Sequence, residues 1–320
     1  MKKVIVLGGT GFVGRSVCEK LVGHGHRVTV ATRDSSRAKP LLHLHGLAVR
    51  EFDVHDESAL TGELRGFDAV VNLIAILHGD RAAFEHTHVA LPGKIARACR
   101  QAGSGTLVHV SALGVDGMNP GAAPSNYLRS KGFGERALRT GVEQSGIALT
   151  MLRPSVIFGA GDKFLTMFAL LQKMLPVMPL AGAEARFQPV WVEDVALAVL
   201  RSLDANPGGP APLESTRIIE ACGPDVFALR ELVQLSAQLS GVRKGRGRPV
   251  VGLPDWAARM QAQLMEWLPG DPLMSRDNLD SMKVDNVATG KVPGLESLDI
   301  KPASLRPIAA QYLQRKLATT

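Results

Sequence analysis

The sequence predicts an α/β fold, in which a doubly wound parallel sheet is followed by a smaller, partly helical C-terminal region. Short runs of apolar, often β-branched residues alternate with helical patterns through the first half of the chain, as in strands joined by helical crossovers. These runs hold few polar residues, which indicates strands buried on both faces. The first run leads directly into a glycine-rich loop and an amphipathic helix.

The elements of this fold can be placed along the chain. Strands are predicted at residues 4–7, 27–31, 48–52, 69–73, 106–110 and 147–152, with the clearest helices at 82–102 and 126–145. After residue 158 the pattern weakens, and we expect a loop at 205–213 and helices at 164–174, 229–239 and 254–267. We assign 1–157 with 187–222 to a Rossmann-type domain, and 158–186 with 223–320 to a smaller substrate-binding region.

The loop after the first strand has the composition of a pyrophosphate-binding site. It reads Gly8-Gly9-Thr10-Gly11-Phe12-Val13-Gly14, a pattern of three spaced glycines between a strand and a helix. Glycine allows a tight turn and lets the backbone approach a ligand closely. The helix that follows offers free N–H groups and the positive end of its dipole. In this context the pattern predicts a bound dinucleotide rather than an ordinary strand–turn–helix.

The residues after the second strand indicate which dinucleotide is expected. An acidic residue at the strand end would accept a hydrogen bond from the ribose 2′-OH of NAD, but the chain has Arg33 there. A guanidinium pairs bidentately with a 2′-phosphate, and Ser35, Ser36 and Arg37 would support it. Asp34 comes too late to bind the ribose and is expected to cap the next helix. The sequence therefore favours NADP(H), with NAD(H) as the alternative.

Composition limits the classes of partner. The chain of 320 residues has a formal net charge of +7, with 45% hydrophobic and 21% charged residues, which is typical of a globular protein. The positive charge suggests an anionic ligand or surface. Aromatic residues make up 5% and are not interleaved with basic runs, which argues against nucleic-acid binding. The histidines show no metal-ligand spacing, so no metal site is expected.

Cysteine usage and the chain's apolar stretches bear on its compartment. Cys18, Cys99 and Cys222 are far apart and fit buried thiols in a reducing environment. The N-terminus reads as a strand rather than as a signal peptide. The most apolar long stretch, residues 164–180, is too short and too interrupted to span a bilayer. We expect a cytoplasmic protein, and peripheral attachment to the inner face of a membrane is left open.

A second set of residues predicts acid–base chemistry. Tyr127 and Lys131 are four positions apart in a predicted helix, so their side chains share one face. We expect the ammonium to lower the pKa of the phenol, so that the phenol exchanges a proton with a substrate oxygen near neutral pH. Ser111 directly follows the strand at 106–110 and can hydrogen-bond the same oxygen. The alternative is a solvated helix face, but the position of this pair in a dinucleotide-binding fold favours a site.

With these motifs the chain resembles the short-chain dehydrogenases/reductases of the extended or atypical kind, which are similar to NAD-dependent epimerases and dehydratases. The resemblance rests on the glycine loop, on Ser111 with Tyr127 and Lys131, and on four further segments. These are Asp53-Val54, Asn72-Leu73-Ile74-Ala75, residues 153–159 and residues 188–196. Residues 109–114, 127–132 and 285–287 resemble more narrowly the nucleotide-binding accessory subunit of respiratory complex I and its bacterial relatives.

The resemblance implies a role for each matching residue. The glycine-loop residues would hold the pyrophosphate: Gly8, Thr10, Gly11, Phe12, Val13 and Gly14. Asp53 and Val54 would face the adenine. Ala75 would line the dinucleotide, and Pro154 would contact its nicotinamide end. Lys131 would hold the nicotinamide ribose, and Tyr127 would be the acid/base. The family's asparagine in the helix after the fourth strand is replaced around His88-Val89-Ala90, so the family's proton relay is incomplete in this sequence.

Three segments are candidates for contact with apolar or anionic partners. The predicted helix at 254–267 carries a stripe that either packs on the second domain or lies at a membrane interface; the stripe is Trp256, Met260, Leu264, Trp267 and Leu268. The apolar helix at 164–174 either fills a core or walls a pocket for a lipophilic, quinone-like substrate. The basic run at 243–248 is either a solvated loop or a contact for phosphate or anionic lipid.

These observations favour an NADP(H)-dependent oxidoreductase acting on a carbonyl or carbinol of a lipophilic, quinone-related substrate. The alternative is a non-catalytic NADPH-binding structural or sensing protein of a membrane-associated redox assembly. A further alternative is a nucleotide-sugar epimerase or dehydratase, against which Arg33 and the apolar helix at 164–174 both weigh. The oligomeric state is left open.

Overall fold

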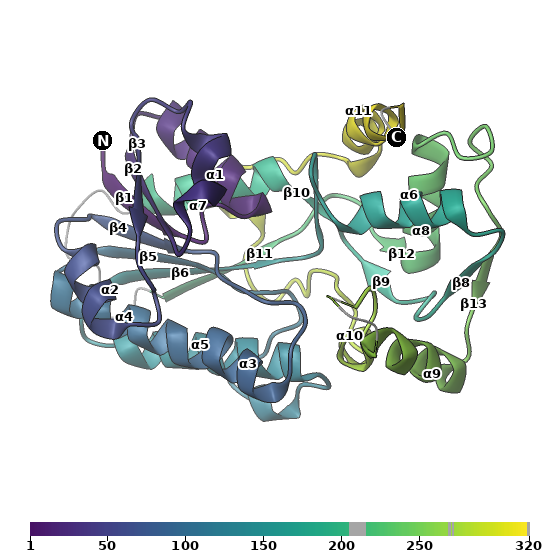
Figure 1. Cartoon of the computed structure of the whole chain (residues 1–320). Helices are drawn as coiled ribbons and strands as arrows, with labels where there is room; N and C mark the ends of the chain where they lie inside the picture. The colour runs from purple at the N-terminus through teal and green to yellow at the C-terminus, as the bar shows by residue number, and fades with distance from the viewer. Residues whose placement is uncertain (205–215, 268–269, 271, 319–320) are drawn as a thin grey trace. The chain divides into compact units, whose positions relative to one another are not determined.

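The structure is a computed structural model that describes residues 1–320 except 205–215, 268–269, 271 and 319–320. It forms two compact units (Figure 1). Unit 1 comprises Met1–Pro154, Glu193–Ala221 and Gly290–Lys301, and unit 2 comprises Ser155–Val192, Cys222–Thr289 and Pro302–Thr320. Within the described residues we find no helix with the length and hydropathy that crossing a membrane requires.

Unit 1 is built on a parallel sheet of seven strands. They are β1 (Lys3–Leu7), β2 (Arg27–Thr32), β3 (Leu47–Glu51), β4 (Ala69–Asn72), β5 (Thr106–Val110), β6 (Ala148–Pro154) and β11 (Thr216–Ala221). Their order is β11-β6-β5-β4-β1-β2-β3, and each neighbouring pair is parallel. The order reverses at β1, and ligands of such sheets bind at the carboxyl ends of the strands beside this point. The predicted doubly wound α/β fold is confirmed.

Helices cover both faces of this sheet (Figure 1). One face carries α1 (Phe12–Gly23) and α7 (Val192–Asp204), which are joined by the ion pair of Lys20 with Glu193 at 2.9 Å. The other face carries α2 (Glu57–Leu64), α4 (Leu91–Ala102) and α5 (Asn126–Val142), packed in that order. Because both faces are covered, the central strands are fully buried, which explains their continuous apolar runs.

The predicted helix at 82–102 is divided into three parts. α3 (Arg81–Glu85) leads into a π-helical turn, η2 (His86–Ala90), and then into α4. Such turns are frequent at functional sites. The His88 carbonyl lies so close to α5 that a Cβ on Gly134 would overlap it. The helix expected at 82–102 is therefore confirmed, but it contains a π-helical turn that was not expected, and a glycine on α5 leaves room for the His88 carbonyl.

Each of the six predicted strands is present within two residues of its expected ends. The seventh strand, β11, was not expected; it pairs with β6 in the register Thr216↔Leu149 to Ala221↔Pro154. The predicted loop at 205–213 lies outside the described residues. The C-terminal helix α11 (Leu305–Ala318) was also not expected.

Unit 2 packs helices around short strand pairs. Besides α11 its helices are α6 (Phe164–Met174), α8 (Leu229–Leu239), α9 (Asp255–Glu266) and α10 (Arg276–Ser281). Its strand pairs are β7 (Ile157–Phe158) with β10 (Val190–Trp191), β9 (Arg186–Phe187) with β12 (Phe227–Ala228), and β8 (Met178–Leu180) with β13 (Val250–Gly252). α8 packs against both α6 and α11.

Most apolar side chains of α6 pack in the core of unit 2, whereas Leu170 and Met174 are exposed. Leu165 and Phe168 are buried, and the Phe164 ring meets the Phe168 ring edge-on with centroids 5.2 Å apart. Met167 and Leu171 are partly buried against the same core. Of the two interpretations of this helix, the structure supports core packing for these side chains.

A network of polar contacts explains three segments that carried the family resemblance. Asn286 Oδ1 accepts hydrogen bonds from the Ser155 hydroxyl at 2.6 Å and from the Val156 N–H at 3.1 Å. The Gln188 N–H donates to the Asn286 carbonyl at 3.0 Å. Within unit 2 these contacts join the segments at 153–159, 188–196 and 285–287, so those residue types have a structural role in the described chain.

The three cysteines are buried free thiols, as expected. Burial raises the pKa of Cys18 and of Cys99 to about 12. Neither thiol is therefore a nucleophile near neutral pH.

The contact between η2 and α5 gives a prediction of stability. Gly134→Ala introduces a Cβ that overlaps the His88 carbonyl, and overpacking of this kind costs about 1–3 kcal/mol. The matched control is Gly62→Ala, also within a helix, where a Cβ meets nothing within 4 Å and should add about 0.5–1 kcal/mol of stability. Urea unfolding should show opposite shifts for the two variants, and equal shifts would contradict the close approach.

Candidate active site

The glycine loop connects β1 to α1 where the strand order reverses. Gly8 has a φ of +85°, a conformation that residues with a side chain rarely adopt. A Cβ on Gly14 would overlap the Gly8 carbonyl, so the first turn of α1 packs directly on the end of β1. Gly11 precedes the helix and makes no side-chain cap. The backbone N–H groups of the first turn therefore face the loop without a capping side chain.

At the end of β2 the structure places an unpaired cation. Arg33 is exposed, and its guanidinium has no hydrogen-bond or ion-pair partner among the described residues. Asp34 caps the short helix η1 (Ser35–Leu41) by accepting a hydrogen bond from the Ser36 N–H at 3.0 Å, as expected. Arg37 Nε lies 3.9 Å from the Asp34 carboxylate. Of the two arginines predicted to bind a 2′-phosphate, Arg33 and Arg37, only Arg33 therefore has no ion-pair partner among the described residues.

Ser35 and Asp53, which are also predicted to bind the cofactor, each take part in a hydrogen bond between a backbone N–H and a carboxylate. The Ser35 N–H donates to the Glu51 carboxylate of β3 at 3.0 Å. After β3, the Asp53 carboxylate accepts from the His55 N–H at 3.0 Å, and Val54 is buried. Asp53 thus stabilises a tight turn directly after β3. Because β2 and β3 are neighbours in the sheet, this turn lies beside the end of β2.

β4 ends at Asn72, whose side chain binds in two directions. Its Oδ1 accepts from the Ile74 N–H at 3.1 Å, and its Nδ2 donates to His109 Nδ1 at 3.0 Å. These bonds fix the loop that carries Ala75, which is exposed. Burial, and then the charge of Lys131, hold the pKa of His109 well below its usual range, so the imidazole is neutral.

Ser111 and Lys131 lie at the carboxyl end of β5. Ser111 is 5% exposed, and its Oγ has no hydrogen-bond partner in the described part of the chain. Lys131 is 1% exposed, and its ammonium donates to the Val110 carbonyl at 2.9 Å. A buried hydroxyl without a partner is uncommon, because its desolvation is not compensated. The Ser111 hydroxyl can therefore form a hydrogen bond with a ligand oxygen.

Tyr127 precedes Lys131 by one turn of α5 and is held by ring contacts. Its ring lies edge-on to Phe84 and His88, with centroids 6.1 Å and 5.6 Å away. Burial raises the pKa of Tyr127 to about 12. The lowering expected from the sequence is therefore wrong, because burial desolvates the phenol and so disfavours its charged form.

His88 is held as a neutral, structural residue. The Ile76 N–H donates to His88 Nε2 at 3.1 Å, so the ring proton is on Nδ1, which donates to Ser130 Oγ at 2.9 Å. The Ser130 hydroxyl in turn donates to the Tyr127 carbonyl at 2.9 Å. Burial, and then the charge of Lys131, lower the pKa of His88 to about 3. His88 thus ties η2 to the backbone of Tyr127 and exchanges no proton near neutral pH.

One turn beyond Lys131, α5 carries a second buried charge. Glu135 is fully buried and pairs in bidentate fashion with Arg153 of β6, with Nε–Oε1 at 2.9 Å and Nη2–Oε2 at 2.5 Å. Burial lowers the pKa of Lys131 to about 8, and the negative charge of Glu135 opposes this fall. Lys131 is therefore mainly charged at neutral pH but titrates just above it.

Two segments thus meet at the carboxyl end of β5: Ser111 follows the strand, and α5 brings Lys131 to Val110 and packs Tyr127 against Ala112 and Val115. Pro154 ends the neighbouring strand, and its carbonyl accepts from the Leu113 N–H at 2.9 Å. Sequence reasoning missed His109 and Ser130, which bind Asn72 and His88. A histidine inside an apolar strand pattern was the one available signal for His109.

This combination of fold and site defines a dinucleotide-binding protein of the short-chain dehydrogenase/reductase type. The family model described as "NAD dependent epimerase/dehydratase family" matches residues 4–213, and the chain belongs to this family.

Individual relatives agree with the family. The chain is 29% identical over 317 residues to NADH dehydrogenase (ubiquinone) 1 alpha subcomplex subunit 9, mitochondrial, of Rattus norvegicus, covering 97% of this chain and 79% of that protein. It is 27% identical over 259 residues to the 2-alkyl-3-oxoalkanoate reductase of Stenotrophomonas maltophilia, covering 75% and 77%. The solved UDP-glucose 4-epimerase of Thermotoga maritima has a TM-score of 0.70 over 98% of this chain and 99% of that chain, at 19% identity, which shows a shared fold.

The residues present fit a dinucleotide on three observations of this structure. The Gly14 position has no room for a side chain, Arg33 lacks a protein partner among the described residues, and the buried Ser111 hydroxyl is unsatisfied. The three positions follow β1, β2 and β5, so each lies at a carboxyl end of the sheet.

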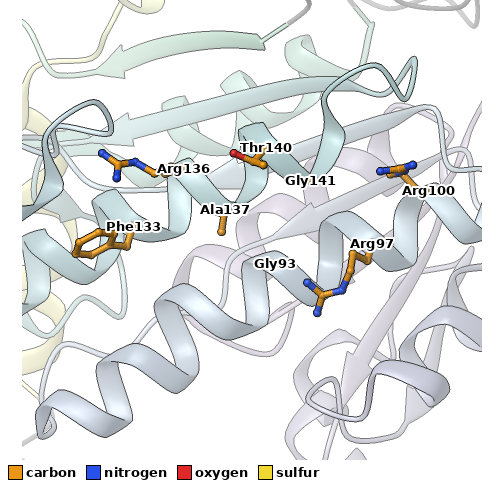
Figure 2. Close-up of a pocket in the computed structure, with 8 residues that line it drawn as sticks. All are labelled: Gly93, Arg97, Arg100, Phe133, Arg136, Ala137, Thr140 and Gly141. Carbon is orange, nitrogen blue, oxygen red and sulfur yellow. The ribbon is translucent and has the colours of Figure 1, made fainter.

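A separate surface hollow lies between α4 and α5 (Figure 2). Side chains from both helices line it: Gly93, Arg97, Arg100, Phe133, Arg136, Ala137, Thr140 and Gly141. None of the residues predicted to bind the cofactor or to act in catalysis is among them, so we assign this hollow no part in the candidate site.

The buried ammonium predicts a pH dependence of stability. Lys131 has a pKa of about 8 in the folded chain and about 10.5 when unfolded, so the unfolded chain binds more protons between these values. Its contribution to stability should therefore rise by about 3 kcal/mol as the pH increases through this window. We expect the unfolding free energy of the wild type relative to Lys131→Met to grow from pH 8 to pH 10.5. The control is the difference between the wild type and Lys39→Met, which removes an exposed ammonium and should not change over this range. If the difference between the wild type and Lys131→Met were also constant with pH, the burial would be contradicted.

Proposed function

We propose that this chain is an NADP(H)-binding oxidoreductase that acts on a carbonyl or carbinol of a lipophilic, quinone-related substrate. The observation that carries the proposal is the unsatisfied, buried Ser111 hydroxyl beside Lys131, with Tyr127 one turn away on the same helix. This is the arrangement of a hydroxyl pair that can hold and protonate a substrate oxygen. The family to which the chain belongs supports a bound dinucleotide.

The preference for a 2′-phosphate rests on Arg33. Its guanidinium is exposed and uncommitted, whereas the Asp34 carboxylate caps the next helix by accepting from the Ser36 N–H. A free guanidinium can form two charge-assisted hydrogen bonds with a phosphate. The glycine loop would hold the pyrophosphate, with Asp53, Val54 and Ala75 along the adenosine half and Pro154 near the nicotinamide.

In the reductive direction the bound cofactor would supply a hydride to the carbonyl carbon. The Tyr127 phenol would donate its proton to the carbonyl oxygen as the carbon–oxygen π bond becomes an alcohol C–O bond, and Ser111 would orient that oxygen. The Lys131 ammonium would hold a cofactor ribose hydroxyl and favour the tyrosinate that remains. A phenol with a pKa of about 12 is protonated near neutral pH, as a proton donor must be.

The substrate class is supported by relatives rather than by α6, because most apolar side chains of this helix pack in the core of unit 2. The relative from Stenotrophomonas maltophilia is named for reduction of an alkyl-substituted oxoalkanoate, which is a ketone on an apolar chain. The mitochondrial relative is named as part of a ubiquinone-reducing enzyme. Both names support a lipophilic carbonyl or quinone for this chain, and the second supports association with a respiratory complex at the inner face of a membrane.

A second candidate is an NADPH-binding structural or sensing protein of such an assembly, without turnover. It is favoured by His88, which occupies the position of the family's asparagine. Both ring nitrogens of His88 form hydrogen bonds within the fold, to the Ile76 N–H and to Ser130 Oγ, so neither is available to relay a proton. A nucleotide-sugar epimerase is a weaker candidate, because it would hold NAD and Arg33 does not suit NAD.

The cofactor assignment is tested by Arg33→Asp. The variant should bind NADPH about 10- to 100-fold more weakly, because a charge-assisted pair is replaced by repulsion, and should bind NADH at least as well as the wild type. Fluorescence titration with both nucleotides measures this, with Arg100→Asp as an exposed arginine control. An unchanged preference would refute the assignment.

The acid/base assignment is tested by Tyr127→Phe. Turnover of NADPH with a panel of ketones and quinones should fall about 10²- to 10⁴-fold while NADPH affinity is retained. Tyr312→Phe, at the chain's only other tyrosine, should lose stability through its lost bond to Asp162 but keep turnover where it is folded. Full activity in Tyr127→Phe would exclude the mechanism, and a wild type that binds NADPH but turns over nothing in the panel would favour the structural alternative.

A further inference from the structure

A second hollow, of about 500 Å³, lies at the amino ends of β1, β2 and β3 within unit 1. The starts of these strands and the turn between α2 and β4 line this amino-end hollow. Because the strands are parallel, it lies at the opposite end of the sheet from Arg33, which follows β2. At about 3.3 Å per residue, Arg27 and Arg33 are about 20 Å apart along this strand. The hollow is therefore separate from the candidate active site, and its volume suits a small molecule.

The described lining of the amino-end hollow has four basic side chains and no acidic one. They are Lys3, Arg27, Arg50 and Arg65, and all four residues are exposed. Arg50 forms an ion pair with Glu63 at 2.5 Å. The side chains of the other three have no hydrogen-bond or ion-pair partner in the described chain. Three cations of the lining can therefore bind an anion without breaking an ion pair.

Two of these cations are neighbours in the sheet. Lys3 of β1 and Arg27 of β2 are register partners, so their side chains start from one face of adjacent strands. Neighbouring strands are about 4.8 Å apart, and two like charges that begin so close repel each other. The Asp68 carboxylate, which accepts from the Lys3 backbone N–H at 2.7 Å, supplies one negative charge beside the pair. Three unpaired cations beside one carboxylate leave a positive surplus that an anion would neutralise.

Thr29 adds a buried hydroxyl to the same lining. It is two residues beyond Arg27 on β2, so both side chains start from the same face of the sheet. Thr29 is 8% exposed, and its hydroxyl has no hydrogen-bond partner among the residues that the structure describes. A hydroxyl that is desolvated without a partner is costly, and a ligand oxygen in the hollow would satisfy it.

Arg50 is fixed in the lining by two contacts. Besides its ion pair with Glu63, its guanidinium lies 5.5 Å from the centroid of the Phe67 ring. Phe67 also lines the hollow and packs against the core of unit 1. This part of the wall is therefore formed before any ligand arrives, which lowers the entropy lost on binding.

We propose that the amino-end hollow binds a molecule that carries a phosphate monoester. Such a group has about 1.5 to 2 negative charges at neutral pH, which matches the positive surplus of the lining. A guanidinium binds two phosphate oxygens at once, an ammonium binds as a point charge, and the Thr29 hydroxyl can donate to a further oxygen. A nucleic acid is disfavoured, because these cations line a hollow rather than an extended face. The site does not depend on the proposed function.

Calorimetric titration of the full chain with phenyl phosphate, without nucleotide, tests this site. Lys3→Gln with Arg27→Gln should weaken binding at least about tenfold, because two charge-assisted contacts are lost. Thr29→Val replaces only the hydroxyl and should weaken binding about fivefold, the loss expected for one hydrogen bond. Both Lys3 and Arg27 are exposed, so the fold should tolerate their replacement, and urea unfolding of each variant checks this.

The matched control is Lys39→Gln with Arg100→Gln, which removes the same charge from exposed positions of unit 1 outside this hollow. It should leave the affinity for phenyl phosphate unchanged, and so should Arg33→Asp at the other end of the sheet. NADPH affinity should be unchanged in the Lys3 and Arg27 double variant, which separates failure of this site from failure of the proposed function.

A soluble ester and a lipid headgroup share the chemistry of a phosphate monoester, and vesicle flotation separates them. Binding to vesicles of phosphatidylcholine with phosphatidic acid that the Lys3 and Arg27 double variant loses would identify a lipid headgroup; binding of phenyl phosphate alone would identify a soluble ester. Absence of both, or an equal loss in the control double variant, would overturn the inference. Loss of phenyl phosphate binding in Arg33→Asp, or tighter binding of duplex DNA by the same cations, would also overturn it.

Discussion

Burial of charge along one face of α5 is the constraint on which the candidate site depends. Lys131 and Glu135 are one turn apart, and both are removed from solvent. The ammonium is held by the Val110 carbonyl of β5, and the carboxylate by Arg153 of β6. Leaving either charge unpaired in the interior would cost several kcal/mol, so these contacts fix the rotation of α5 against the sheet. Tyr127, on the same helix, is placed by that rotation.

α5 also contacts the π turn η2, and this contact places His88 against Ser130 and Tyr127. Gly134 lets the His88 carbonyl approach, and the His88 ring then reaches Ser130 and the Tyr127 ring. The same buried ammonium helps to keep His88 and His109 neutral. The site therefore holds a single cation among neutral polar groups. Such a setting favours one anionic or hydroxylic ligand group beside Lys131, while burial keeps the phenol of Tyr127 protonated.

Much of this could be predicted from the sequence because it depends on local patterns. The strands β1 to β6 follow from apolar runs, and the glycine loop follows from its spacing between a strand and a helix. Asp34 was correctly expected to cap a helix, since its side chain binds a backbone N–H two residues away. The family resemblance was also correct, because its motifs are short and contiguous.

What could not be predicted depends on burial and on contacts between distant segments. The predicted direction of the Tyr127 pKa shift was wrong, because the spacing of Tyr127 and Lys131 in the sequence does not show how deeply the phenol is buried. The π turn at His86–Ala90 was missed because residues 82–102 have an unbroken helical pattern, and the contact of this turn with Gly134 is made to another helix. The apolar stripe predicted on the helix at 254–267 is exposed at Trp256, Met260, Leu264 and Trp267, so core packing is wrong for these side chains, and only the structure shows that the small alanines of α9 face inward. The roles assigned to Asp53, Val54, Ala75 and Pro154 stay predictions.

The central claim is that unit 1 binds a dinucleotide with a 2′-phosphate. Calorimetric titration of the full chain with NADPH and with NADH, together with mass spectrometry of any nucleotide released after gentle purification, tests it most directly. The account predicts released NADP(H), and NADPH affinity at least about tenfold above NADH affinity, equivalent to one charge-assisted hydrogen bond. Release of NAD(H) alone, or tighter binding of NADH, would contradict it.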